Sequence, residues 1–399
     1  YILDKGGIMN KSCYRLLVYL IIINSFISIT NKFYPGFLQI GKILGGLLLI
    51  NIAIIFKETL KIKDIFFCIF LGIFSGLAIL HSVEHSITIE HLMFFISTTS
   101  IIWKLCESNV RINLKQVLSN KIKLLNRYVF FIVGLLLIGL IMPSCYKYIN
   151  GDNLYYGFAE SGHKLAGNIC FVTALTIFIY QKRKFQLYQV CILGILFMIL
   201  LMTGSRTYCI PEIILLFVYY KFNIGKLRTK WIITPIILVA TVYLIINSNV
   251  LERFISMGNN TYVSSNFWEA VSSGRLIWWK IDIQEFAKLS IIEQLLGKGF
   301  AFVYHINEQF YGLKIGAHND FLNILLSVGW IGLIGYILII LNLFFKFGRQ
   351  LFFKNDKSII MKLSLIAVYI LWNANINGFY GAQQYLFSFI ILILIFDKN

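Results

Sequence analysis

The sequence has little charge and very little proline. Charged residues make up 14% of the 399 positions and only 4 residues are proline, whereas 58% are hydrophobic and the mean hydropathy is +0.76. A compact soluble domain could not bury this much apolar surface, so the composition excludes that class and indicates a lipid bilayer. Few prolines and 16% aromatic residues favour long helices with interfacial Trp and Tyr over an outer-membrane barrel.

Closely spaced metal ligands and cysteine pairs are also scarce. The 7 cysteines stand singly, without a Cys-x-x-Cys pair or a nearby histidine group, so they support neither a disulfide framework nor a zinc site. One group of outer residues could hold a metal, but no third ligand is fixed, and a solvated loop is the preferred interpretation. Its members are His81, Glu84, His85, Glu90 and His91. We expect no metal and no cofactor.

Twelve apolar windows are long enough to cross, or nearly cross, a bilayer, although several are shorter than the ~20 residues of a typical span. They lie at 13–30, 40–56, 65–80, 91–106, 128–145, 165–180, 187–202, 207–221, 231–247, 321–345, 359–375 and 383–396. Met9 could be an initiator, so the fold prediction omits residues 1–8. The first window lacks a small-residue cleavage site and is expected to remain as a span. The prediction is an all-α polytopic membrane protein with about 12 transmembrane helices.

The basic residues fall in alternate connections between these windows. With the N-terminus in the cytoplasm, most of the 36 Lys and Arg residues lie on the cytoplasmic side, as the positive-inside rule requires. Both termini are then cytoplasmic. The net charge of +18 is explained by this topology, so a nucleic-acid partner is not expected.

One connection is much longer than the others. Residues 248–317, between the ninth and tenth windows, are rich in aromatic residues and are predicted to be extracytoplasmic. Long loops on a rigid scaffold often carry function. We therefore predict transmembrane helices 1–9 in residues 1–247, an extracytoplasmic loop with short helices in 248–317, and transmembrane helices 10–12 in 318–399.

Arg206 lies in a very short outer turn, Thr203–Thr207. An arginine within the hydrocarbon costs about 3 kcal/mol on insertion scales. At a helix end the side chain could instead extend to the interface and serve as an anchor. Because the positive-inside rule disfavours arginine in a short outer turn, we favour a functional role for Arg206.

A second group of residues whose placement costs free energy lies in the long loop. There Ser272 to Gly274 precede Arg275, Trp278 and Trp279. Ser-Gly-Arg suits a turn that opens a helix, whose free amide groups favour an anion. Arg275 would add a bidentate contact to phosphate oxygens. The segment also fits an amphipathic helix with its tryptophans at the lipid headgroups, and the two interpretations are compatible.

The third group is His318, Asn319 and Asp320, where the long loop re-enters the membrane. Asp320 is predicted to cap a helix that begins at Phe321. A lone histidine is more often structural than catalytic. Here the neighbouring arginines and the depth of an amphiphilic substrate's head group favour a general base, because histidine titrates near neutral pH.

The order of these motifs resembles the O-antigen ligase and polymerase superfamily, of the Wzy and WaaL type, over about half of the chain. The motifs are Gly204-Ser205-Arg206, Gly274-Arg275 with Trp278, Gly297-Lys298-Gly299-Phe300, and Ala317-His318-Asn319-Asp320-Phe321-Leu322. The resemblance implies metal-independent, inverting glycosyl transfer on the outer face of the bacterial plasma membrane. The implied donor is a glycan linked to undecaprenyl diphosphate.

The resemblance also implies roles for individual residues. Arg206 and Arg275 would bind the diphosphate, and His318 would act as a base on, or orient, the acceptor hydroxyl. No firm equivalent is found for further basic residues of the family, although His163 and Lys164, with Asn168, could contribute. The remaining expected substrate-binding residues are Ser205, Gly274, Trp278 and Asn319.

Three functions fit this pattern. The leading hypothesis is a polymerase that joins lipid-linked repeat units into capsule, exopolysaccharide or O-antigen, beside flippase and chain-length regulator proteins. A ligase of the same superfamily is the close alternative. A lipid-oligosaccharide flippase or permease fits less well, because a transporter should show halves of matching hydropathy with charges on a central path, whereas here the costly residues lie on one face.

Overall fold

The computed structural model describes residues 6–33, 36–149, 152–181, 187–222, 275–312, 314–376, 378–379 and 383–397. The chain divides into two compact units, and each unit combines three separate chain segments. The first unit contains Tyr1–Leu17, Gly45–Val110 and Met257–Gln383, and the second contains Val18–Leu44, Arg111–Ser256 and Gln384–Asn399. Helices α1 (Gly6–Thr30) and α2 (Gly36–Glu58) contribute residues to both units.

The described residues contain eight helices that are long and apolar enough to cross a membrane. Their spans are Ser12–Thr30, Gln39–Glu58, Ile62–Leu80, His85–Leu105, Ile122–Leu140, Gly162–Tyr180, Asp320–Phe353 and Ile359–Ile376. Two shorter apolar helices, Leu187–Met202 and Gln384–Phe396, coincide with the predicted windows 187–202 and 383–396. The helical, polytopic class is therefore confirmed. The total of twelve spans and their orientation stay predictions, and the window 231–247 lies outside the described residues.

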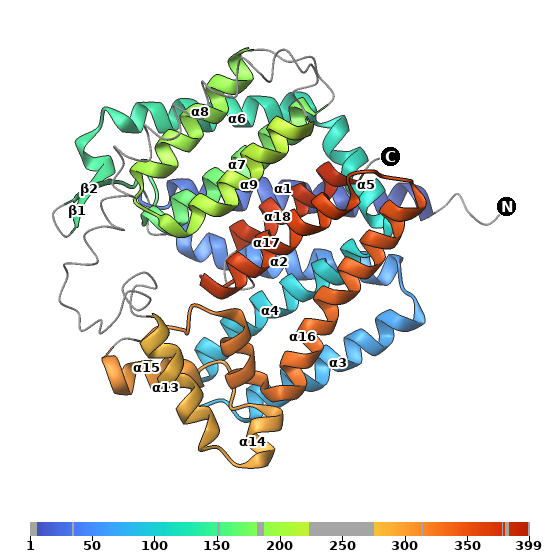
Figure 1. The fold of residues 1–399 in the computed structure, drawn as a ribbon, viewed down its shortest axis with the longest axis vertical. Coiled ribbons are helices and arrows are strands. Elements are labelled where there is room, and N and C mark those ends of the chain that lie inside the picture. Colours follow the sequence, from blue (N-terminus) through green and yellow to red (C-terminus); the bar gives the residue numbers. More distant parts are fainter. Residues whose placement is uncertain are drawn as a thin grey trace. The chain divides into compact units, whose positions relative to one another are not determined.

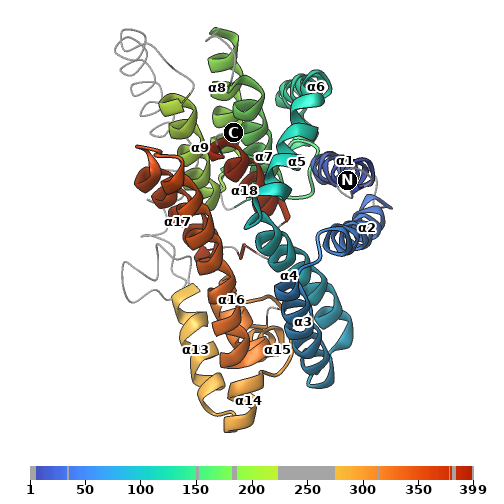
Figure 2. The ribbon, with the colours of Figure 1, turned by 90° about the vertical axis from the view of Figure 1, so that its right-hand side faces the viewer.

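In the first unit, α16 packs against α3, α4 and α17, while α13, α14 and α15 gather at its N-terminal end (Figures 1 and 2). The bounds are α3 (Ile62–Leu80), α4 (His85–Leu105), α13 (Arg275–Ala287), α14 (Ile291–Leu296), α15 (Phe302–Tyr311), α16 (Asp320–Phe353) and α17 (Ile359–Ile376). The outer face of α16 exposes a stripe of large apolar side chains, as a lipid-facing helix requires. The stripe contains Trp330, Ile331, Ile334, Leu338, Leu341 and Phe345.

Helix α16 is broken at Gly329, and the segment after α14 fills the break. Gly329 has φ 69° and ψ −171°, which are not helical values. The amides of Lys298 and Gly299 donate to the carbonyls of Leu326 and Ser327, each at 2.9 Å. These contacts satisfy backbone groups in an apolar environment. The Gly297–Phe300 motif thus joins α14 to the broken helix.

Glycine is needed on both sides of this junction. A Cβ at Gly329 would lie 2.2 Å from the carbonyl oxygen of Leu295, and one at Gly297 would lie 2.3 Å from that of Ser327. Gly297 and Gly329 also have positive φ values, which side chains rarely tolerate. The two backbones can approach this closely only because neither residue has a side chain.

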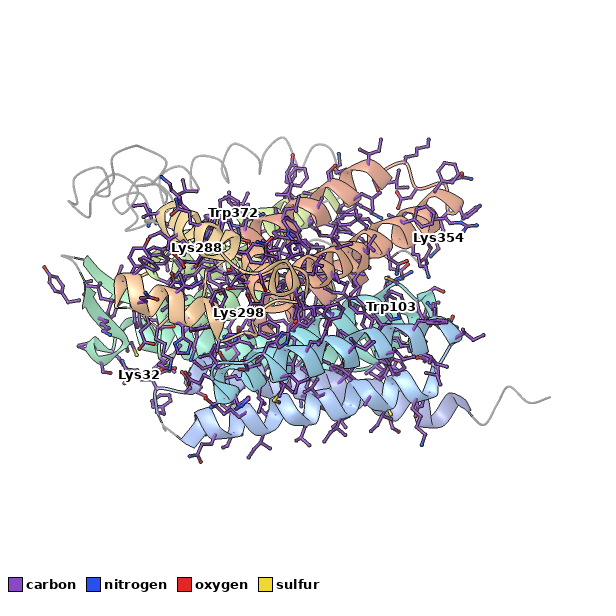
Figure 3. The ribbon with its side chains drawn as sticks, turned by 90° about the horizontal axis from the view of Figure 1, so that it is seen from below. Lys32, Trp103, Lys288, Lys298, Lys354 and Trp372 are labelled. Atoms are coloured by element: carbon purple, nitrogen blue, oxygen red, sulfur yellow. The ribbon has the colours of Figure 1, made fainter. Side chains whose placement is uncertain are left out.

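The two ends of the first unit carry different side chains. Figure 3 places Lys288 and Lys298 toward one end, and Trp103 and Lys354 toward the other. Lys354 caps the C-terminus of α16. The end with Lys288 and Lys298 is formed by α13 and α14 together with the N-terminal part of α16.

In the second unit, α7 is the central helix and packs against α6, α8 and α9. The bounds are α5 (Ser108–Asn120), α6 (Ile122–Leu140), α7 (Gly162–Tyr180), α8 (Leu187–Met202), α9 (Cys209–Phe222) and α18 (Gln383–Phe396), with the short helices η1 (Pro143–Cys145) and η2 (Arg206–Tyr208). Nearly all of α7 is buried, and the rings of Phe171 and Phe387 connect it to α18 at 6.0 Å. A helix that is apolar all round must be surrounded by other helices.

Two local structures differ from the sequence prediction. Strands β1 (Tyr146–Ile149) and β2 (Asp152–Tyr155) form an antiparallel hairpin before α7 in an otherwise α-helical protein. The basic segment after α4 is not a simple connection, because it forms α5. The Nε atom of Arg111 in α5 donates to Asp397 at 2.9 Å, with both side chains buried. Hydropathy did not indicate this helix because α5 is rich in polar residues and contains no long apolar window.

Candidate functional site

The C-terminal end of α17 connects two of the predicted site segments. At the start of α13, Arg275 donates from Nη1 to the carbonyl of Ile376. The side chain of Asn319 donates to that of Asn375 at 3.3 Å. The amide of Phe379 donates to Asp320 at 2.6 Å. Asn375, Ile376 and Phe379 therefore form a shared support for Arg275 and for the segment that contains His318.

His318 has a left-handed backbone conformation, with φ 53°. This conformation is uncommon for a residue other than glycine, and it persists only where surrounding contacts enforce it. The indole of Trp279 donates to the carbonyl of Ala317 at 2.7 Å, and the Ala317 amide donates to Asn323 at 3.0 Å. Contacts on the chain before His318 thus hold the histidine at a defined place.

The predicted helix cap after His318 is wrong by one residue. Asn319 is the N-cap of α16, and its side chain accepts from the amide of Leu322 at 3.1 Å. Asp320 lies in the first turn, where its carboxylate is buried and accepts from the hydroxyl of Tyr336 at 3.2 Å. Because Asp320 is engaged by Tyr336 and Phe379, the capping role falls to the neighbouring amide, and both ends of the Asn319 amide have partners within the protein.

An aromatic group lies beside His318. The Trp278 ring centroid is 6.2 Å from that of His318 and 5.9 Å from that of Tyr311. Arg275 and Trp278 are three residues apart on α13, so they share a face of that helix. All four side chains are partly exposed. The first unit therefore combines a cation, an imidazole and an aromatic ring.

Asp282 is a further residue of this group that the sequence reasoning missed. It lies on α13 one turn after Trp278, is fully buried, and has a carboxyl pKa that burial raises to about 7. The raised Tyr311 pKa has two causes, burial first and the Asp282 charge second. An acidic residue four positions after a tryptophan was the available sequence signal.

The second unit contains Arg206, Ser205 and His163. Arg206 begins η2 after Gly204, which has φ 67°. The hydroxyl of buried Ser205 lies 3.4 Å from Nδ1 of His163, which is exposed in the first turn of α7. A Cβ at Gly162 would lie 3.0 Å from the carbonyl oxygen of Thr203, so the missing side chain lets the α7 terminus approach this turn.

The other predicted residues of this region have structural partners. Lys164 pairs with Glu160 at 2.5 Å on the surface. The buried side chain of Asn168 accepts from Ser25 at 2.8 Å and donates to Ser28 at 2.9 Å, which connects α7 to α1. Gly274, the remaining predicted contact, lies outside the described residues.

The histidines and acids at residues 81–91 form separate contacts, and no three candidate ligands come together in the described ranges. His81 is 3.2 Å from the carbonyl of Gly297. His91 is 2.6 Å from the hydroxyl of Tyr304, and Glu84 pairs with Lys314 at 2.6 Å. These side chains stabilise the packing of α4, and of the connection between α3 and α4, against α14, α15 and the chain that follows α15.

Comparison with known protein families gave a match over part of the chain. A family model described as O-antigen ligase matches residues 191–337. The matched range includes Arg206, Arg275 and His318 but neither His163 nor Lys164. No curated protein matches the chain. The family match and the long apolar helices together indicate a multi-pass membrane protein.

Proposed function

Starting from the O-antigen ligase/polymerase superfamily, which the match over residues 191–337 supports, we propose that this protein polymerises lipid-linked oligosaccharide repeat units. The reaction is an inverting, metal-independent glycosyl transfer from an undecaprenyl-diphosphate-linked glycan to the next lipid-linked unit. It takes place on the extracytoplasmic face of the bacterial plasma membrane. The product is a capsule, exopolysaccharide or O-antigen chain.

One observation carries the proposal: Asn375, Ile376 and Phe379 support both Arg275 and the segment around His318. A cation and an imidazole held by the same short segment keep a fixed separation during a reaction. Fixed groups contribute to catalysis because little reorganisation is needed when charge develops.

Arg275 is proposed to bind the diphosphate of the donor. Departure of the lipid diphosphate builds negative charge, and a guanidinium can stabilise that charge more strongly in the transition state than in the ground state. The hydrogen bond from Nη1 of Arg275 to the carbonyl of Ile376 orients the guanidinium plane. Arg206 is proposed as a second diphosphate-binding arginine, and its turn contains Ser205 next to His163.

His318 is proposed to take the proton from the acceptor hydroxyl or to orient that hydroxyl for attack on the anomeric carbon. The new glycosidic bond forms as the bond from the anomeric carbon to the phosphate oxygen breaks, which gives inversion. Trp278, beside His318, would cover a sugar face and exclude water, the competing acceptor.

Complementation of a strain that lacks the gene tests this function. The variants are His318→Ala, Arg275→Ala and Arg206→Ala, compared with wild type at equal membrane abundance. Exposed His85 and Arg349 provide matched alanine controls outside the proposed site. We expect the rate of glycosyl transfer to fall by a factor on the order of 10²–10³ for each arginine variant and of about 10²–10⁴ for the His318 variant. The readout is the length distribution of surface glycan and of lipid-linked intermediates.

The outcome also separates polymerase from ligase, the alternative that the family description itself favours. A wild-type ladder of chain lengths, with single lipid-linked units in the variants, supports polymerisation. Full-length lipid-linked chains that fail only to reach their final acceptor would make the protein a ligase. Variants as active as wild type would refute the proposed roles of these residues.

A further inference from the structure

Three buried polar atoms lie near the Trp278 ring without a hydrogen-bond partner among the described residues. They are the two carboxyl oxygens of Asp282 and the hydroxyl oxygen of Tyr311. Burial of a polar atom without a hydrogen bond costs free energy. Folded proteins leave few such atoms, and those that persist call for a specific explanation.

The surroundings of Asp282 do not provide a charged partner. Helix α13 packs against α15 and α16, and its buried face places Asp282 one turn before buried Phe286. The Asp282 charge contributes, after burial, to the raised pKa of Tyr311 on α15. Burial is the sole cause of the Asp282 shift, so no described cation balances this carboxylate.

The protonation state of Asp282 suits hydrogen bonding to a neutral ligand. With a pKa of about 7, the carboxyl is neutral in a large fraction of molecules near neutral pH. A neutral carboxyl can donate one hydrogen bond and accept others, and a phenol can also do both. Together, these groups match the hydroxyl groups of a sugar.

The position of the pair relative to Trp278 adds a surface for a sugar ring. Trp278 and Asp282 are four residues apart on α13, so they lie on one face of the helix. The Trp278 ring has two ring neighbours, with centroid distances of 5.9 Å to Tyr311 and 6.2 Å to His318. An aromatic ring flanked by a few polar groups is a common arrangement in ligand sites.

We propose that Asp282 and Tyr311 bind hydroxyl groups of the sugar whose face packs on Trp278, beside His318. This inference rests on the proposed function and names a specificity-determining subsite within it. Sites that hydrogen-bond a substrate hydroxyl through buried polar groups discriminate strongly against a sugar that lacks it. Asp282 and Tyr311 would thus help decide which repeat unit is used.

The test uses the purified full-length protein in lipid nanodiscs. Its substrate is the lipid-linked repeat unit extracted from the strain that lacks the gene, and the readouts are kcat, KM and the unfolding temperature. The variants are Asp282→Leu, Asp282→Asn and Tyr311→Phe. Glu285→Gln on the same helix is the control, because Glu285 pairs with exposed Lys288.

We expect Asp282→Leu to raise KM at least tenfold without lowering the unfolding temperature, because an apolar residue replaces an unpaired buried carboxyl. Asp282→Asn keeps a donor and an acceptor and should retain KM within about threefold of wild type, while Tyr311→Phe should raise it. Asp282→Leu with wild-type KM would overturn the subsite. If Asp282→Leu fails to fold, Tyr311→Phe decides, and a wild-type KM for it would also overturn the subsite.

Failure of the proposed function gives a different result. In that case wild type itself would not elongate the lipid-linked unit, nor transfer it to another acceptor. If wild type elongates the unit and His318→Ala does not, the proposed function stands. A wild-type KM for the Asp282 and Tyr311 variants would then refute only the subsite.

Discussion

Single residues in the candidate site are held by contacts from distant parts of the chain. His318 adopts a positive φ, and the preceding Ala317 carbonyl is fixed by Trp279. Asn319 and Asp320 are fixed by Asn375 and Phe379. Backbone strain of this kind concentrates at functional sites, where surrounding structure compensates its cost. The strain thus supports a functional role for His318 independently of its side-chain chemistry.

The pH dependence of stability provides a prediction for Asp282. Its ordinary pKa of 3.8 is raised to about 7 in the folded protein, so the folded state binds more protons than the unfolded state between these values. Stability should therefore fall as pH rises from about 4 to about 7, and then become constant for this group. Asp282→Asn removes the titrating carboxyl and with it this pH dependence. The gain in stability of Asp282→Asn over wild type should therefore be larger at pH 8 than at pH 4.

Unfolding temperatures of wild type and Asp282→Asn at the two pH values measure this difference. Glu285→Gln controls for the loss of an acidic residue on the same helix. A stabilisation of equal size at pH 4 and pH 8 would show that the Asp282 carboxyl keeps an ordinary pKa.

At the scale of secondary-structure elements, the most distinctive feature is the junction between α14 and the break in α16. The break at Gly329 frees backbone groups within a long apolar helix, and the amides of Lys298 and Gly299 bind the carbonyls before it. This junction fixes the N-terminal part of α16, which begins directly after His318. The motif at residues 297–300 therefore has a structural explanation in the packing of these elements.

Gly329→Ala should destabilise the protein by about 2 kcal/mol or more, because its Cβ would meet the Leu295 carbonyl at a positive φ. Gly72→Ala in α3 is the matched control, since nothing lies within 4 Å of its Cβ position. The unfolding temperature and the transfer rate of each variant measure the effect. Equal unfolding temperatures for the two variants would contradict the close packing of α14 on α16.

At the scale of the whole molecule, each unit is assembled from segments that are far apart in the sequence. The first unit combines residues near α3 and α4 with the chain from α13 to α17, and the second combines α1 residues with α5–α9 and α18. In the first unit, the candidate site residues lie at the end formed by α13 and the start of α16. Lys354 lies at the opposite end (Figure 3).

The predicted orientation places Lys354 in the cytoplasm and Lys288 outside. Lys288→Cys should react with a membrane-impermeant maleimide in intact cells, whereas Lys354→Cys should react only after permeabilisation, because each lysine is exposed at its own end of the unit. Wild type, with 7 native cysteines, provides the background labelling. The reverse pattern would contradict the orientation and the extracytoplasmic active site.

Several parts of the site followed from local sequence. His318 and Arg206 stand out because polar residues are costly beside apolar windows. Arg275 stands out because a Ser-Gly-Arg turn that opens a helix favours an anion. Lys164 and Asn168 were instead selected as possible counterparts of further basic residues in the family that the sequence resembles, yet their contacts are with Glu160, Ser25 and Ser28. The sequence could not exclude them. Ser25 and Ser28 are far from Asn168 along the chain, and nothing in the sequence distinguished Glu160 as the partner of Lys164.

The sequence by itself determined the solvent, the helical class and the order of the motifs, because hydropathy and residue spacing are local properties of a chain. Only the tertiary structure decided that Asn319 rather than Asp320 caps α16 and that Asp282 is buried. It also decided that Ile376 and Phe379 support both Arg275 and the His318 segment. Burial and hydrogen-bond partners depend on residues brought together by packing. A single carboxylate therefore reads as an ordinary surface group until its neighbours are known.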